Sequence, residues 1–174
     1  MNAIQLLRTM HGDTKVRFKL ILGEREEKAA SDQWNDLQKL MEIHEQIEDR
    51  YVYTPISEEQ GLGTPLGDWD LLHEDDVAWV KALIGEVEKY TPATPDWRTA
   101  VGRVNDALAK HVTDEEGQIF GRIEQVWGPE RLDRVGAEMQ KHIPAPDGAK
   151  PAPKAPAPKA AAPSKTTQNS RRKS

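Results

Sequence analysis

Four histidines could share one chemical task, because each lies in a different helix-like segment and on its apolar side. They are His11, His44, His73 and His111. Two of them are followed four residues later by a carboxylate, Glu48 after His44 and Glu115 after His111. On a helix, residues at this spacing share one face, with Cβ atoms about 5–6 Å apart. Burying an imidazole and a carboxylate without partners would cost several kcal/mol, so something must compensate.

The segments that carry these residues show helical periodicity, with apolar side chains at steps of three and four. Helices are predicted over 2–22, 32–53, 65–90 and 96–127, with a short fifth helix over 129–141. Gly23 is expected to end the first helix and Ser31 to cap the second, and residues 24–30 either continue a helix or form the connection. No segment alternates as a strand does. Long helices with fairly short connections predict an all-α fold, an antiparallel up-down four-helix bundle.

The histidines are predicted to lie at one height in this bundle. The distance from His11 to the end of its helix matches the distance from the start of the second helix to His44. The same comparison places His73 level with His111, since every helical residue rises 1.5 Å. Glu48 and Glu115 join this layer, and Glu45 flanks His44. Imidazole nitrogen and carboxylate oxygen suit iron, manganese or zinc, and a bound metal pair would neutralise the buried carboxylates.

The composition divides the chain into an acidic body and a basic tail. Residues 145–174 contain five Lys, two Arg and one Asp, a net charge of +6, whereas the whole chain carries −5, so residues 1–144 carry −11. The tail is rich in Pro, Ala and Lys and has almost no large apolar residue, which predicts a disordered segment. It could be an electrostatic arm for nucleic acid or another polyanion, or a solubilising spacer.

Several classes of protein are excluded or disfavoured by the sequence. The chain has no cysteine, so disulfides, thiolate metal sites and cysteine nucleophiles are excluded. The first residues lack the pattern of a signal peptide, and no run reaches the roughly 18 apolar residues of a membrane helix. A soluble cytoplasmic protein is therefore expected. The Glu-x-x-His pairs of ferritin-like ferroxidases are absent.

Four motifs, in order along residues 1–127, resemble those of the hemerythrin-like, or HHE cation-binding, family. They are LLRTMHGDTKV around His11, LMEIHEQIED around His44, LLHEDDVAWVKAL around His73 and LAKHVTDEEGQIF around His111. The second and fourth contain H-x-x-x-E. One such motif has little specificity, but four in this order and spacing have much more. The resemblance implies a four-helix bundle that holds a non-haem di-iron centre.

The resemblance also implies roles for individual residues. His11 and His44 would bind one iron, and His73 and His111 would bind the other. Glu48 and a carboxylate of the fourth helix would bridge the two ions.

The sequence departs from the oxygen-carrying hemerythrins at two places. Those proteins have a second histidine on the third helix, where this chain has Val77, and their fourth-helix carboxylate would correspond to Glu116. The pattern is more similar to the hemerythrin-like domain of the F-box iron and oxygen sensor, in which the glutamate after the second-helix histidine is a ligand. Glu45 and Glu115 fit that pattern. Glu115 is therefore the preferred bridge, with Glu116 in reserve.

These residues predict a di-iron protein that binds or senses iron, oxygen, peroxide or nitric oxide. An anionic ligand in place of a neutral imidazole should favour ferric iron, which makes reversible oxygen carriage less expected than sensing or peroxide chemistry. Whether the protein is an enzyme stays open. The alternatives are a mononuclear or zinc site, and a metal-free helical interaction module whose basic tail contacts nucleic acid. Tyr51 and Tyr53 are expected mainly to pack.

Overall fold

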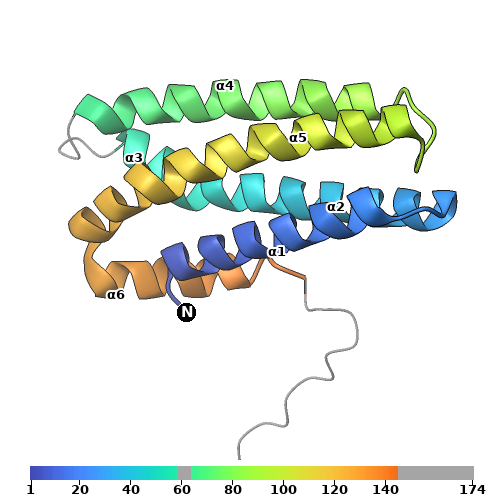
Figure 1. Ribbon diagram of the computed structural model, residues 1–174. Coiled ribbons are helices and arrows are strands. Elements are labelled where there is room, and N and C mark those ends of the chain that lie inside the picture. Colours follow the sequence, from blue (N-terminus) through green and yellow to red (C-terminus); the bar gives the residue numbers. More distant parts are fainter. Residues whose placement is uncertain (59–63, 145–174) are drawn as a thin grey trace, which may run out of the picture. The chain divides into compact units, whose positions relative to one another are not determined.

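The structure is a computed structural model that describes residues 1–58 and 64–144, with side chains described at 1–58 and 73–144. The predicted tail, 145–174, lies outside the described residues. Met1–Pro144 form one compact unit. Within it the fold is an all-α antiparallel four-helix bundle, as the periodicity predicts (Figure 1). No helix in the described ranges is long and apolar enough to cross a bilayer.

The first half of the bundle contains two long helices joined by a tight connection. Helix α1 (Ala3–Gly23) begins with a capping box, in which Asn2 and Gln5 each accept a hydrogen bond from the other's backbone amide. Helix α2 (Glu27–Glu48) starts earlier than predicted. The Glu26 side chain accepts hydrogen bonds from the amides of Lys28 and Ala29, so the first turn is already capped and Ser31 lies inside the helix.

The rest of the bundle continues α2 and adds two further stretches. A π-helical turn η1 (Asp49–Tyr53) and a short helix α3 (Thr54–Glu58) follow α2, where a loop from residue 54 was expected. Helix α4 (Thr64–Val87) and helix α5 (Pro95–Asp114) pack side by side (Figure 1). Thr94 caps α5 and Pro95 occupies its first turn.

The fourth stretch is not one continuous helix, as was predicted for 96–127. A second π-helical turn, η2 (Glu115–Ile119), separates α5 from α6 (Phe120–Gln140). Gly128 has φ 68°, and this positive φ kinks α6 immediately before Pro129, where the fifth helix was expected. The chain then packs back against α1 (Figure 1).

The apolar core is split into two clusters along the bundle. One surrounds the start of α1 with η1, α3 and α6, and includes Leu7, Val52 and Ile123. The other joins the end of α1 to the start of α2, the end of α4 and the start of α5, and includes Phe18 and Val104. The four histidines lie on the helices between these two clusters, so a polar layer interrupts the core.

Candidate metal centre

The polar layer brings six of the predicted site residues together as two overlapping clusters. The first cluster is His11, His44, Glu48 and Glu115, and the second cluster is Glu48, His73, His111 and Glu115. Within each cluster, one potential ligand atom per residue lies within 4.8 Å of all the others. Five of these six side chains are buried, and His44 is nearly so. Each cluster could therefore hold a metal ion.

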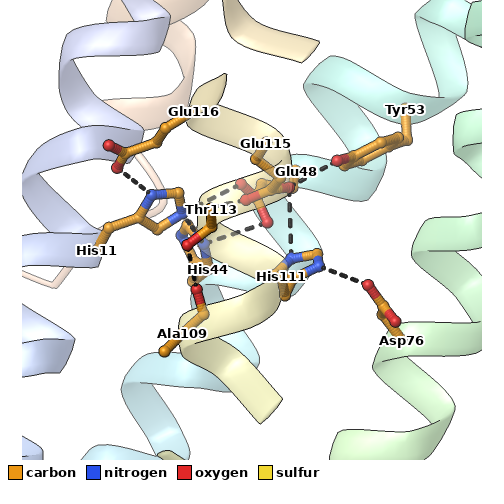
Figure 2. A network of polar contacts seen from close by, with 10 residues as sticks. All are labelled: His11, His44, Glu48, Tyr53, Asp76, Ala109, His111, Thr113, Glu115 and Glu116. Carbon is orange, nitrogen blue, oxygen red and sulfur yellow. Dashed lines mark hydrogen bonds and ion pairs between the residues drawn. The ribbon is translucent and has the colours of Figure 1, made fainter. Parts of the chain in front are cut away.

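Glu115 is oriented so that its two oxygens face different histidines. Its Oε2 lies 3.3 Å from Nε2 of His11, and its Oε1 lies 3.4 Å from Nε2 of His111 (Figure 2). Glu48 lies opposite, with Oε2 3.2 Å from Nε2 of His44 and Oε1 3.8 Å from Nε2 of His11. The oxygens of Glu115 thus contact one histidine of each cluster, His11 and His111, whereas those of Glu48 contact His11 and His44 of the first cluster.

Both shared carboxylates lie at π-helical turns. Glu48 ends α2 immediately before η1, and Glu115 is the first residue of η2. A π-helical turn widens the helix by one residue and is often found at functional sites. In both halves of the bundle, the H-x-x-x-E pair is therefore followed directly by the same backbone irregularity. The sequence gives no periodicity signal for it, and it was not predicted.

Carboxylates outside the two clusters contact one histidine of each pair, His11 and His111. Nδ1 of His11 lies 2.8 Å from Oε1 of Glu116, so this carboxylate contacts the outer side of the ring (Figure 2). Nδ1 of His111 lies 3.4 Å from Oδ2 of Asp76. An imidazole that binds metal through one nitrogen commonly hydrogen-bonds a carboxylate through the other.

Tyr53 contributes more than packing. Its hydroxyl donates a hydrogen bond of 2.6 Å to Oε1 of Glu115 (Figure 2). Its ring also stacks on His73, with centroids 3.7 Å apart. Burial and the neighbouring Glu115 charge raise the pKa of the Tyr53 phenol, so it stays a donor. In the sequence, Tyr53 lies five residues after Glu48. The π-helical turn η1 places this position so that its hydroxyl reaches Glu115.

The electrostatics of the layer differ among the histidines. Burial alone would lower the pKa of His11, but the neighbouring carboxylates of Glu115 and Glu48 outweigh it and raise the value to about 10. Burial lowers the pKa of both His44 and His73, so these rings are neutral. Burial would raise the pKa of Glu48, but His44 and His11 lower it, so Glu48 is ionised.

Some buried polar atoms of the layer make no hydrogen bond in the part of the chain that the structure describes. They include Oε1 of Glu48, Oε2 of Glu115, and Nδ1 of His44 and of His73. Unpaired buried polar atoms are rare because each costs free energy. A cation between the carboxylates would satisfy the two oxygens, so the donor set fits a bound metal.

Comparison with known families gives the same conclusion. The model of the hemerythrin HHE cation binding domain matches residues 2–123. The chain belongs to this family. The hemerythrin HHE match covers the four histidines of the layer and both shared carboxylates. The general function of the domain is therefore cation binding.

The HHE chain is also similar to a curated protein named DNA nickase from Nostoc sp. (strain PCC 7120 / SAG 25.82 / UTEX 2576). The two are 20% identical over 140 residues, which make up 80% of this chain and 38% of the relative. The chain therefore spans well under two thirds of that protein. No solved structure matches the chain.

One predicted site residue of this HHE domain lies apart from the others. Glu45 belongs to neither cluster, and its Oε1 accepts a hydrogen bond of 2.6 Å from Nζ of Lys81 on α4. The reserve bridge Glu116 belongs to neither cluster, and it contacts the outer nitrogen of His11 with its side chain 38% exposed. The structure thus brings Glu115 into both clusters, and leaves Glu45 paired with a lysine.

Two cavities flank the layer. The larger, of about 300 Å³, extends from the histidines between α2 and α4. The smaller, of about 200 Å³, lies on the other side of His111 and is bordered by Asp76, Lys110, Asp114 and Gln118. Small molecules therefore have space beside the candidate centre.

Proposed function

We propose that this HHE domain is a non-haem di-iron protein that binds or senses oxygen, peroxide or nitric oxide. The observation that supports it best is the sharing of Glu48 and Glu115 by both clusters. Two sites with common carboxylates favour a metal pair over one ion. Nitrogen and oxygen donors without sulfur are compatible with iron.

The proposed ligands divide between the two positions. His11 and His44 would hold one ion, His73 and His111 the other, and Glu48 and Glu115 would bridge them. Glu45 would join the set only by giving up its contact with Lys81. An iron pair supplies reversible one- and two-electron chemistry, while the buried carboxylates favour its more highly charged ferric form.

The chain's own residues have defined tasks in this proposal. Tyr53 holds Oε1 of Glu115, and Glu116 and Asp76 orient His11 and His111. The two apolar core clusters keep bulk water from the layer from both ends. These contacts fix the donor atoms before any metal enters.

The test is metal analysis and absorption spectroscopy after anaerobic loading with ferrous iron and exposure to air. We expect about two irons per chain and near-ultraviolet bands typical of a bridged ferric pair. His44→Ala should abolish both, whereas His142→Ala, which removes the exposed histidine bonded to Tyr51, should change neither. Failure to bind stoichiometric iron would refute the proposal. One ion per chain would instead indicate a mononuclear site, and a preference for zinc or manganese would indicate a site for that metal.

A second candidate function is contact with nucleic acid through the basic tail. It is supported by the net charge of +6 over 145–174 and by similarity to a protein named DNA nickase. Replacing the five tail lysines by glutamine should weaken binding to a DNA duplex and flatten its salt dependence. Conversion of supercoiled plasmid to nicked circles by the wild type, and its loss in Glu115→Gln, would indicate metal-dependent nicking. Salt-independent or absent binding would exclude this function.

A further inference from the structure

Exposed aromatic side chains lie on one side of α4. Trp79 is 60% exposed, and Tyr90, in the turn that follows the helix, is 41% exposed. No other Trp, Tyr or Phe is exposed among the side chains that the structure describes. The two residues are eleven positions apart, or about three helical turns, so they lie on the same side. Trp and Tyr are enriched at protein interfaces, which makes this side of α4 a candidate surface for association.

This side of α4 faces away from the core of the bundle. Leu83 and Val87 are buried on the opposite side, in the core cluster that includes Phe18 and Val104. In the described residues, α4 packs on α5 and α3, and it lies along one edge of the bundle (Figure 1). The outer face of α4 and its last turn consists of the exposed residues Asp75, Ala78, Trp79, Ala82, Gly85 and Lys89. A second protein could therefore reach this face.

The outer face is complementary to itself about Ala82. Ala82 is seven residues from both Asp75 and Lys89, and three residues from both Trp79 and Gly85. When a second copy of α4 packs antiparallel with Ala82 against Ala82, Asp75 of each copy meets Lys89 of the other. Trp79 of each copy likewise meets Gly85 of the other. One twofold axis generates both sets of pairs, as in an isologous dimer.

The surface opposite Trp79 is open. A Cβ atom at Gly85 would meet nothing within 4 Å in its own chain, and Ala82 carries only a methyl group. The indole ring of one copy can therefore lie against the helix backbone of the other. Small residues at a contact let two helices approach to about 8 Å, the lower end of the usual range. Burial of this exposed ring supplies a hydrophobic gain on association.

The charges favour the antiparallel arrangement over a parallel one. In the antiparallel register, Asp75 faces Lys89, and the exposed Glu86 faces Ala78, so no like charges oppose each other on the outer face. Lys89 contacts Glu86 in its own chain, but both side chains are at least half exposed and this pair contributes little. Lys89 can therefore turn to Asp75 of a second copy. A parallel register would place Asp75 against Asp75 and Lys89 against Lys89.

We propose that the outer face of α4 joins two copies of this chain in a symmetric dimer, with the two α4 helices antiparallel about Ala82. From Asp75 to Lys89 the contact is about 21 Å long, which is small for a protein interface. We therefore expect a dissociation constant on the order of 10 µM. The inference goes beyond the proposed function and does not rest on it, because no residue of the outer face belongs to either cluster.

Sedimentation velocity of the full chain over about 1–500 µM measures the dimer directly. We expect the mass of one chain at the lowest concentrations and of two chains at the highest. Trp79→Ala should raise the dissociation constant at least about tenfold, as truncation of a central interface residue does. Leu20→Ala, at a site 61% exposed on α1, is the matched control and should leave it unchanged.

Charge reversal tests the register of the two helices. Asp75→Lys and Lys89→Asp should each weaken the dimer by about threefold to tenfold, because each places like charges together twice in a symmetric dimer. The double variant restores opposite charges, so its dissociation constant should return to within about threefold of wild type. A dimer in which the double variant gives no such rescue would overturn the antiparallel register, and the proposal with it.

Two other results would overturn the dimer. One is a dimer that Trp79→Ala does not weaken, and the other is a chain that stays monomeric up to about 500 µM. If the monomeric chain also shields Trp79 from acrylamide quenching, measured as the difference in fluorescence from Trp79→Phe, another part of the same chain covers the face. Iron content of the same samples separates the proposals. Normal iron without a dimer overturns the dimer alone, and a dimer without iron overturns only the di-iron proposal.

Discussion

The hydroxyl of Tyr53 donates a hydrogen bond of 2.6 Å to Oε1 of Glu115, the oxygen that also faces His111. Tyr53→Phe removes this donor and leaves a buried charged acceptor less satisfied. We expect the free energy of unfolding of the metal-free protein to fall by about 1.5–3 kcal/mol, as for hydrogen bonds to charged groups. Denaturant titration measures this.

Tyr51→Phe is the control for that variant. The Tyr51 hydroxyl lies 2.8 Å from Nε2 of His142 in an exposed pair, so its loss should cost under about 0.5 kcal/mol. Iron stoichiometry should survive in both variants, because no donor atom of either cluster is removed. Equal stabilities of the two variants would show that the Tyr53 contact does not hold Glu115.

The contact of Tyr53 with Glu115 also marks the limit of prediction from sequence. The common height of the four histidines follows from the constant rise of a helix, so spacing alone placed His11 beside His44 and His73 beside His111. The π-helical turns after Glu48 and at Glu115 each insert one residue into a helix, and the apolar pattern of these segments did not predict them. Contact of Tyr53 with the layer depends on one of those turns.

Two other features of the structure, one long-range and one local, were also not predicted from the sequence. Glu45 follows His44 directly, but its partner Lys81 is 36 residues away and its pairing is decided by the spacing of α2 and α4. The start of α2 at Glu27 depends on the side-chain rotamer of Glu26, which outcompetes a good capping residue, Ser31, further along. Neither detail was needed to predict the fold class.

Glu115 and Glu116 should respond differently to loss of charge. Glu115→Gln changes a member of both clusters, so we expect binding of both irons to weaken and total iron to fall below one per chain. Glu116→Gln keeps both clusters and weakens only the contact with Nδ1 of His11, which should lower metal affinity by about 10- to 100-fold. Competition with a chelator of known affinity measures both. The reverse order would make Glu116 the bridging residue.

Metal binding should release a proton from His11. Its pKa is raised to about 10 in the metal-free fold, so the ring is protonated at neutral pH, whereas His44 and His73 have lowered pKa values and are already neutral. A metal ion at Nε2 of His11 must displace that proton. Between pH 6 and 8, we therefore expect apparent affinity for Mn²⁺ to rise about tenfold per pH unit.

Calorimetry in buffers of different ionisation enthalpy counts the protons directly. The expected count at pH 7 is about one for wild type and His142→Ala. The raised pKa of His11 also stabilises the metal-free fold. This contribution to the free energy of unfolding is complete below the ordinary pKa of 6.5 and is lost as the pH rises through about 10. Binding of Mn²⁺ without proton release would contradict a protonated His11.

Gly136 shows how closely α6 packs on the start of α1. A Cβ at this position would lie 2.7 Å from backbone atoms of Met1, Asn2 and Ala3, and backbone cannot move aside as a flexible side chain can. Gly136→Ala should therefore lower the free energy of unfolding by about 1–3 kcal/mol, although alanine favours helix. Gly102→Ala in α5 meets nothing within 4 Å and should raise it by up to about 1 kcal/mol. Denaturant unfolding of both variants tests the pair, and a stabilised Gly136→Ala would mean that α6 does not dock against the start of α1.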